Sequence, residues 1–225
     1  MSDRDSFIDE VNDEVRRDRF YFMLRRYGWI AALAVVLIVG GAAWNEFRKA
    51  QDRAQAENLG DEILAALSAR DPGARFEGLD SIEAETLGAQ AVVDLLVAAE
   101  AQQAGNITAA VAALDGVALN LEAPPIYRQV AAFKSLVLQG DTLDSATRRQ
   151  QFEALASPGA PLSLMAQEQL ALIDIEEGQT QAAIAKYQAI LQDAGVSADL
   201  QQRALQVIVA LGGSPEISNL PGIGN

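Results

Sequence analysis

The sequence contains no cysteine and no histidine among its 225 residues. Without these residue types the chain cannot build a Cys/His zinc site, and it has neither a thiol nor an imidazole for catalysis. The missing cysteines do not identify a redox compartment, because a domain that needs no disulfide folds on either side of a membrane.

Aromatic residues are scarce, at 6% of the chain, although half of all residues are hydrophobic. Ala, Leu, Gln and Glu are abundant after residue 50, and this composition favours helices over strands. Positive charge is also in deficit, with 17 Lys and Arg against 31 Asp and Glu, a net charge of −14. Because phosphate binding needs clustered Lys and Arg, we expect neither nucleic acid as the main partner nor broad adhesion to anionic lipid.

Catalytic motifs are missing as well. The sequence has no G-x-S-x-G and no P-loop with G-K-[ST], and the glycines after residue 211 lie in a Gly/Pro-rich segment that fits no phosphate cradle. Asp174, Glu176 and Glu177 lie at the end of a predicted helix, where we expect a solvated face rather than a metal site. We therefore expect no enzyme, no cofactor and no small-molecule substrate.

A long apolar run is the strongest signal that the sequence does contain. Residues 27–45 are 19 consecutive residues without a formal charge, and as a helix they would span roughly 28 Å, close to the hydrocarbon thickness of a bilayer. A tryptophan lies near each end, where amphipathic rings prefer the headgroup boundary. The side chains expected to anchor the chain are Trp29, Leu33, Val36, Leu37, Val39 and Trp44.

Two other structures would produce a similar run. A helix buried in a soluble core is disfavoured because no polar face interrupts residues 29–43. A cleaved signal peptide would find small residues at 41–43, but its leader would be unusually long and would contain seven acidic residues before Tyr27. We predict an uncleaved transmembrane helix at residues 27–45.

The flanking charges predict an orientation. Five Arg lie within about 15 residues before the run, whereas two Arg and one Lys lie just after it. This bias favours a cytoplasmic N-terminus and a translocated C-terminal domain. From residue 46 onward the chain is acidic, with 11 Lys and Arg against 24 Asp and Glu.

The rest of the chain divides into four further parts. Residues 1–26 form a charged leader in which Phe7, Val11 and Val15 predict a short amphipathic helix, either a solvated tail or a docking helix. Residues 46–73 continue the helix out of the membrane, with a bend at Gly60, until Asp71-Pro72-Gly73 ends it. Residues 74–211 form a helical domain, and residues 212–225 form a flexible tail. Helices are predicted in that domain at 88–104, 106–120, 125–139, 145–156, 162–177, 180–194 and 198–211.

Internal similarity indicates helical repeats. Aligning Gly105 on Gly178 places Ala109 and Ala110 on Ala182 and Ala183, and Leu114 on Tyr187. Gly140 begins a third, weaker copy. The glycine spacings of 35 and 38 residues are near the period of about 34 residues of tetratricopeptide helix pairs.

A physical reason supports this alignment. Gly closes the first helix of a pair because it adopts the left-handed conformation without strain. Alanines four and five residues later let the second helix pack closely, and larger residues such as Tyr187 fill the space toward the next pair. We predict a tetratricopeptide-like α-solenoid, with a generic helical bundle as the alternative.

The order of these parts resembles a known family. The leader contains VNDEVRRD at residues 11–18 and LRRYG at residues 24–28, followed by the apolar run, Trp44, a long Gln/Ala-rich helix and degenerate helix pairs. Over residues 8 to about 210 the chain resembles the YfgM-like family, ancillary subunits of the bacterial SecYEG translocon. The first 60 residues and the order of parts carry the resemblance.

The resemblance implies a bacterial inner-membrane protein with a periplasmic domain. It also implies association with SecYEG and with a membrane-anchored periplasmic chaperone of the PpiD type. The function expected is a non-enzymatic scaffold that meets chaperones or emerging substrates near the translocon exit. The alternative is a cell-envelope or cell-division assembly factor that uses the same fold for another partner.

Overall fold

The computed structural model describes residues 3–216, and it describes side chains from residue 25 onward except at residues 31 and 32. Over residues 3–216 the chain forms helices and no strands, which confirms the prediction of an all-α protein. The chain divides into two compact units after Gly60. Each unit is described by itself.

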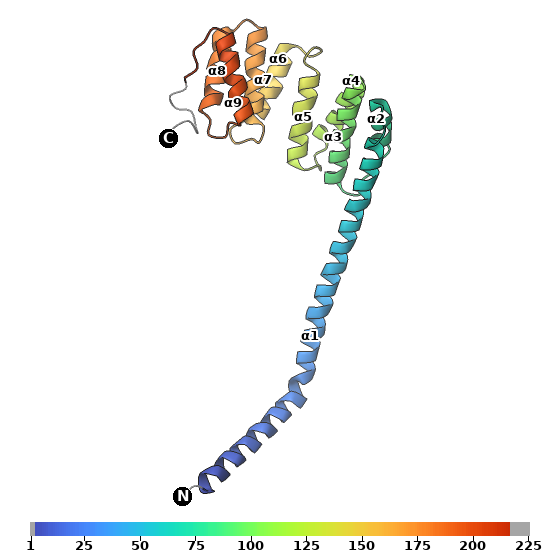
Figure 1. Ribbon diagram of the computed structural model, residues 1–225, viewed down its shortest axis with the longest axis vertical. Helices are drawn as coiled ribbons and strands as arrows, with labels where there is room; N and C mark the ends of the chain where they lie inside the picture. The colour runs from blue at the N-terminus through green and yellow to red at the C-terminus, as the bar shows by residue number, and fades with distance from the viewer. Residues whose placement is uncertain (1–2, 217–225) are drawn as a thin grey trace. The chain divides into compact units, whose positions relative to one another are not determined.

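The described part of the first unit is a single helix, whose last turns belong to the second unit. Helix α1 (Asp3–Leu67) is continuous from the leader through the apolar run (Figure 1, blue to cyan). Helix α1 also continues through Gly60, where a bend was expected, and its helical hydrogen bonding is not interrupted there. The amphipathic face predicted from Phe7, Val11 and Val15 lies outside the described side chains.

The segment Asp71-Pro72-Gly73 begins a helix rather than ending one, which corrects the prediction. Helix α1 already ends at Leu67, and Pro72 is the first residue of α2 (Pro72–Asp80). Asp71 caps α2, because its Oδ2 accepts a hydrogen bond from the Ala74 N–H at 3.0 Å. Proline is favoured at this position because its fixed φ suits a first helical residue and its missing N–H is not needed there.

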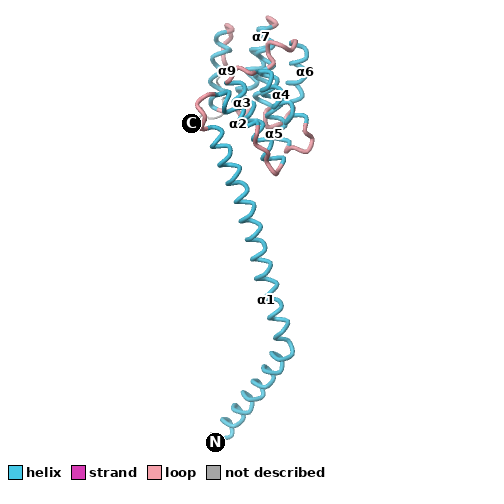
Figure 2. The backbone as a smooth tube through the Cα atoms, turned by 90° about the vertical axis from the view of Figure 1, so that its right-hand side faces the viewer, coloured by secondary structure: helices cyan, strands magenta, loops and turns pink. Residues whose placement is uncertain are grey.

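Seven helices follow, one for each predicted segment, and no boundary differs from its prediction by more than two residues. Side-chain caps fix four of the seven starts: Thr86, Asn106, Asp144 and Ser197 each accept a hydrogen bond from a backbone N–H in the first turn. Short loops join the helices (Figure 2). They are α3 (Leu87–Gln103), α4 (Ile107–Leu119), α5 (Pro125–Leu138), α6 (Ser145–Leu155), α7 (Ser163–Glu176), α8 (Thr180–Gln192) and α9 (Ala198–Ala210).

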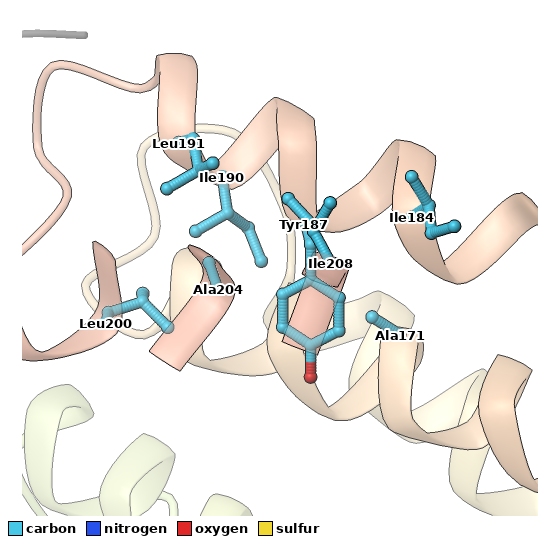
Figure 3. Packing of buried hydrophobic residues seen from close by; sticks show 8 residues of the cluster. All are labelled: Ala171, Ile184, Tyr187, Ile190, Leu191, Leu200, Ala204 and Ile208. Atoms are coloured by element: carbon cyan, nitrogen blue, oxygen red, sulfur yellow. The ribbon is translucent and has the colours of Figure 1, made fainter. Parts of the chain in front are cut away.

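The core of this second unit is a series of three apolar clusters along the chain. The first joins α3, α4 and α5, the second joins α5, α6 and α7, and the third joins α7, α8 and α9. In the third cluster the Tyr187 ring lies among Ala171, Ala204 and Ile208 (Figure 3). Helices α5 and α7 each belong to two clusters, so neighbouring clusters share a helix.

Three glycines end helices in the same way. Gly105, Gly178 and Gly212 have φ of 77°, 73° and 80°. At each of them two hydrogen bonds close the helix, as for Gly178, where its own N–H donates to Ile175 O at 3.0 Å and the Gln179 N–H donates to Asp174 O at 2.7 Å. Gly178 and Gly212 are 34 residues apart.

Gly140 does not belong to this set, so the expected left-handed helix end is wrong at this position. Its φ is not positive, and six residues separate α5 from α6 instead of the three that separate α3 from α4. Seven residues before Gly105 and Gly178 lie the buried Ala98 and Ala171. The equivalent residue before Gly140 is Phe133, whose ring meets Phe152 edge to face at 5.8 Å between centroids. A bulky aromatic contact thus replaces the close approach of two small residues.

The beginning of the expected flexible tail is also packed, which corrects the prediction for residues 212–214. Gly213 lies against Ile184 and Ile208, so that a Cβ there would be 3.1 Å and 3.0 Å from their side chains. Gln188 Nε2 donates a hydrogen bond to Ser214 O at 3.3 Å. Residues 217–225 lie outside the described range.

Candidate interaction surfaces

The expected anchor residues lie on the surface of α1. Trp29, Val36, Leu37, Val39 and Trp44 are each more than 60% exposed, and Leu33 is half exposed. This part of α1 is long and apolar enough to cross a membrane by length and composition. Each end also carries a cation over an aromatic ring, with Arg26 5.9 Å from the Tyr27 centroid and Arg48 5.8 Å from the Trp44 centroid.

The expected repeat-packing residues divide between the interior and the helix ends. Ala110 and Ala183 are fully buried, and so are Leu114 and Tyr187 at the next aligned position. Burial raises the pKa of the Tyr187 hydroxyl to about 12. Ala109 and Ala182 are half-buried, and the glycines at 105, 140 and 178 lie in the turns. Because Ala110 and Ala183 are inside, they shape the fold and are not open to a partner.

The acidic residues at the end of α7 form ion pairs, so the expectation of a solvated face is wrong for Asp174. This carboxylate is 1% exposed. Its Oδ1 accepts a hydrogen bond from Arg149 Nη1 at 2.8 Å, and its Oδ2 accepts one from Lys186 Nζ at 2.5 Å. Burial raises the pKa of Asp174, but the bonds from Lys186 and Arg149 outweigh it, so that the pKa is lowered.

These pairs hold three helices together. Arg149 on α6 also donates to Glu177 Oε2 at 2.8 Å, and neighbouring Arg148 pairs with Glu176. Lys186 brings α8 to the same carboxylate of α7. Since one acidic helix end meets cations from both neighbouring helices, the cluster is structural. Sequence reasoning missed it because Arg149 and Lys186 lie 25 and 12 residues from Asp174.

The remaining charge of the second unit is strongly asymmetric. Residues 61–216 contain 8 Lys and Arg against 21 Asp and Glu. Five of the eight cations are used in ion pairs within the unit, including Arg75 with Glu100 at 2.6 Å and Arg203 with Glu168 at 2.8 Å. From residue 76 to residue 127 the sequence has no Lys or Arg and eight Asp and Glu. The surface of α3 and α4 is therefore negative.

One end of this acidic region exposes large apolar side chains. Leu119 and Leu121 are 79% and 82% exposed, the highest values among the large apolar residues that the structure describes in the second unit. Leu87 and Ile126 are exposed to a lesser degree, at 45% and 43%. We call these four residues the apolar end.

The four residues lie at the same end of the helices. Helices α3, α4 and α5 are joined by short turns and pack in sequence, so consecutive helices run antiparallel. The first turn of α3, the last turn of α4 and the first turn of α5 therefore meet. A Cβ on Gly88 would lie 3.6 Å from Pro124 Cγ and 3.9 Å from Tyr127 Cε2, which places the start of α3 directly beside the α4–α5 connection.

Within the described residues, carboxylates form no group of three or more that could hold a metal ion. Comparisons of the chain with protein-family models, with curated proteins and with solved structures each gave no match.

Proposed function

We propose that this chain is a membrane-anchored, non-enzymatic scaffold whose helical domain binds other proteins. The observation that carries the proposal is the direct continuation of an exposed apolar helix into a helical domain. Helix α1 contains the membrane-length segment and ends in the second unit, where Ala66 lies against Gly78 of α2. The chain has the parts needed to hold a binding surface close to a bilayer.

A tetratricopeptide-like solenoid is the architecture that we propose for this domain. Its support is the recurrence of the left-handed glycine end at Gly105, Gly178 and Gly212. The 34 residues between Gly178 and Gly212 equal the usual period of such repeats. In this interpretation α3–α4 and α7–α8 are regular pairs, α5–α6 is a divergent pair, and α9 is the first helix of a further pair.

The location and partners that we propose come from the family resemblance and the charge bias around the span. The leader would be cytoplasmic, the span would lie in a bacterial inner membrane, and the domain would be periplasmic. The scaffold would associate with SecYEG and with a PpiD-type chaperone. An acidic domain with few free cations suits protein partners better than nucleic acid or anionic lipid.

Photo-crosslinking in intact membranes tests this function. A photoreactive residue would replace Ala112, Gln151 or Gln192, which are exposed on α4, α6 and α8. We expect adducts with translocon subunits or the chaperone from at least one position. The control is the same chain carrying Val36→Arg and Val39→Arg, whose span should fail to insert and which should give none of these adducts. Adducts dominated by cell-division or envelope-assembly proteins would instead support the alternative function.

A further inference from the structure

We propose that the apolar end binds a segment of a partner polypeptide in which apolar side chains are flanked by Lys or Arg. This inference rests on the proposed scaffold function and adds to it the chemistry of the partner. The surface consists of Leu119 and Leu121 at its centre, with Leu87 and Ile126 beside them. Three exposed carboxylates, which we call the acidic collar, lie next to these residues in the chain: Glu83, Glu85 and Glu122.

The two central leucines are held outward by an ordered connection. Asn120 fixes the loop, because its Oδ1 accepts the Glu122 N–H at 3.1 Å and its backbone oxygen accepts the Ala123 N–H at 3.0 Å. The flanking residues Val117 and Ala123 are buried, at 2% and 3% exposure. Leu119 and Leu121 are therefore presented by a fixed turn, and a partner would not need to order this loop on binding.

The negative charge around the apolar end determines which kind of partner can bind there. The collar residues lie in the stretch from 76 to 127 that contains no Lys or Arg. The nearest cations on either side of it are Arg75, which is already paired with Glu100, and Arg128, which lies two residues after Ile126 on α5. An anionic lipid surface or a nucleic acid would be repelled by such a collar, whereas a segment with Lys or Arg beside its apolar residues is complementary to it.

The probe for the test is a labelled peptide with a short Leu run flanked by Lys. The full chain would be held in nanodiscs of phosphatidylcholine, and empty nanodiscs of the same lipid would give the background. Fluorescence anisotropy should show saturable binding above that background. Peptides with Glu in place of Lys, or with Ser in place of Leu, should not bind. Raising the salt from about 0.05 to about 0.5 M should weaken binding, because it screens exposed charges.

Variants of the surface test its residues. Leu119→Ser with Leu121→Ser should weaken peptide binding about tenfold or more, as expected when two leucines no longer lose water on binding. Glu83→Gln with Glu85→Gln and Glu122→Gln should weaken binding and remove most of the salt dependence. The matched controls are Met165→Ser with Val209→Ser for the leucines, and Glu153→Gln with Asp199→Asn and Glu216→Gln for the collar. Both control variants should bind as the unchanged chain does, since they alter exposed residues elsewhere.

The outcomes separate this inference from the function on which it rests. Equal loss in the surface variants and their controls, or equal binding of the Glu peptide, would overturn the proposed surface. Preference for anionic vesicles over the peptide would also overturn it and would indicate a lipid contact. If translocon adducts form in membranes while the leucine variant still binds the peptide, the function stands and the surface is wrong. If leucine-dependent binding is seen without translocon adducts, the surface stands and the partner in the membrane is another protein.

Discussion

Ala110 and Ala183 are single residues on which the close approach of two helices depends. Each lies five residues after a left-handed glycine and is fully buried. Ala183→Leu should lower the free energy of unfolding by roughly 1–3 kcal/mol, because the added carbons have no space. Gln181→Leu, at an exposed position on the same helix, should change it by about half a kcal/mol or less. Thermal melts of the full chain in detergent measure both.

The aligned alanine provides an independent check. Ala110→Leu should cost as much as Ala183→Leu, and the two losses should roughly add because the sites belong to different helix pairs. If Ala110 tolerated Leu while Ala183 did not, the two segments would not be equivalent and the repeat architecture would lose its main support.

Asp174 should make stability depend on pH. Its pKa is lowered below the ordinary 3.8, so its stabilising contribution is complete above about pH 4 and is lost as the pH falls through the lowered pKa. Asp174→Asn should therefore cost about 1–3 kcal/mol near neutral pH, and the difference from the unchanged chain should shrink at lower pH. Melts from about pH 7 to about pH 3 measure this difference. A gap that stays constant over that range would contradict the assignment.

Ala110, Ala183 and Asp174 show which contacts of single residues can be predicted from the sequence and which cannot. Ala110 and Ala183 could be aligned because their spacing from a glycine is local. The partners of Asp174 could not be found, since charges that meet across three helices leave no local pattern. The apolar end was missed for a related reason: Leu119 and Leu121 look like core residues until the packing of α4 on α3 and α5 is known.

At the scale of the helices, the glycines at helix ends can be compared directly, because Gly105 and Gly178 have positive φ and Gly140 does not. Gly105→Ala and Gly178→Ala should each cost about 1–2 kcal/mol, because an L residue is strained at positive φ even where space is open. Gly140→Ala should stay within about half a kcal/mol, since its φ is not positive and a Cβ would make an ordinary contact of 3.4 Å with Val137 O. Denaturation of the three variants in one detergent tests this. Equal losses at all three positions would show that strain is not the cause.

The span in α1 can be tested as an element. Val36→Arg places a charge near the centre of the apolar run and should cost about 2.5–3.5 kcal/mol on insertion scales. One such change need not prevent insertion of so apolar a helix, but Val36→Arg with Val39→Arg should. Extraction of membranes at alkaline pH measures insertion. A double variant that remains in the membrane pellet would contradict the transmembrane assignment, and Glu57→Arg on the exposed part of α1 is the control.

Helices were easier to predict than their connections. Period and composition located the seven helices from α3 to α9, because apolar spacing and capping residues are local signals. Helix α2 was missed because Pro72 was interpreted as a stop, although Asp71 before it is a favoured N-cap. The third copy was misplaced because Gly140 has the right residue type and spacing, but the six-residue connection after α5 removes the need for a left-handed turn.

For the whole molecule, orientation is the property to measure. The Arg excess before the span predicts that residues 46–225 are translocated. A broad-specificity protease added to spheroplasts should digest this domain and leave the leader and span protected. Full protection in spheroplasts, with digestion only after lysis, would reverse the orientation. A cytoplasmic protein followed in the same samples is the control for lysis.

The residue seven before each of the three glycines that end a helix, Gly105, Gly178 and Gly212, has a consequence for protein engineering. It is Ala98 before Gly105 and Ala171 before Gly178, but Leu205 before Gly212. A designer who wished to lengthen the helical domain would append a helix copied from α8 to follow α9. That added helix would meet a leucine at the point where α4 and α8 meet an alanine. Leu205 is partly buried against the third cluster, so Leu205→Ala should lower the stability of the present chain but raise that of a fusion in which the added helix needs the same space.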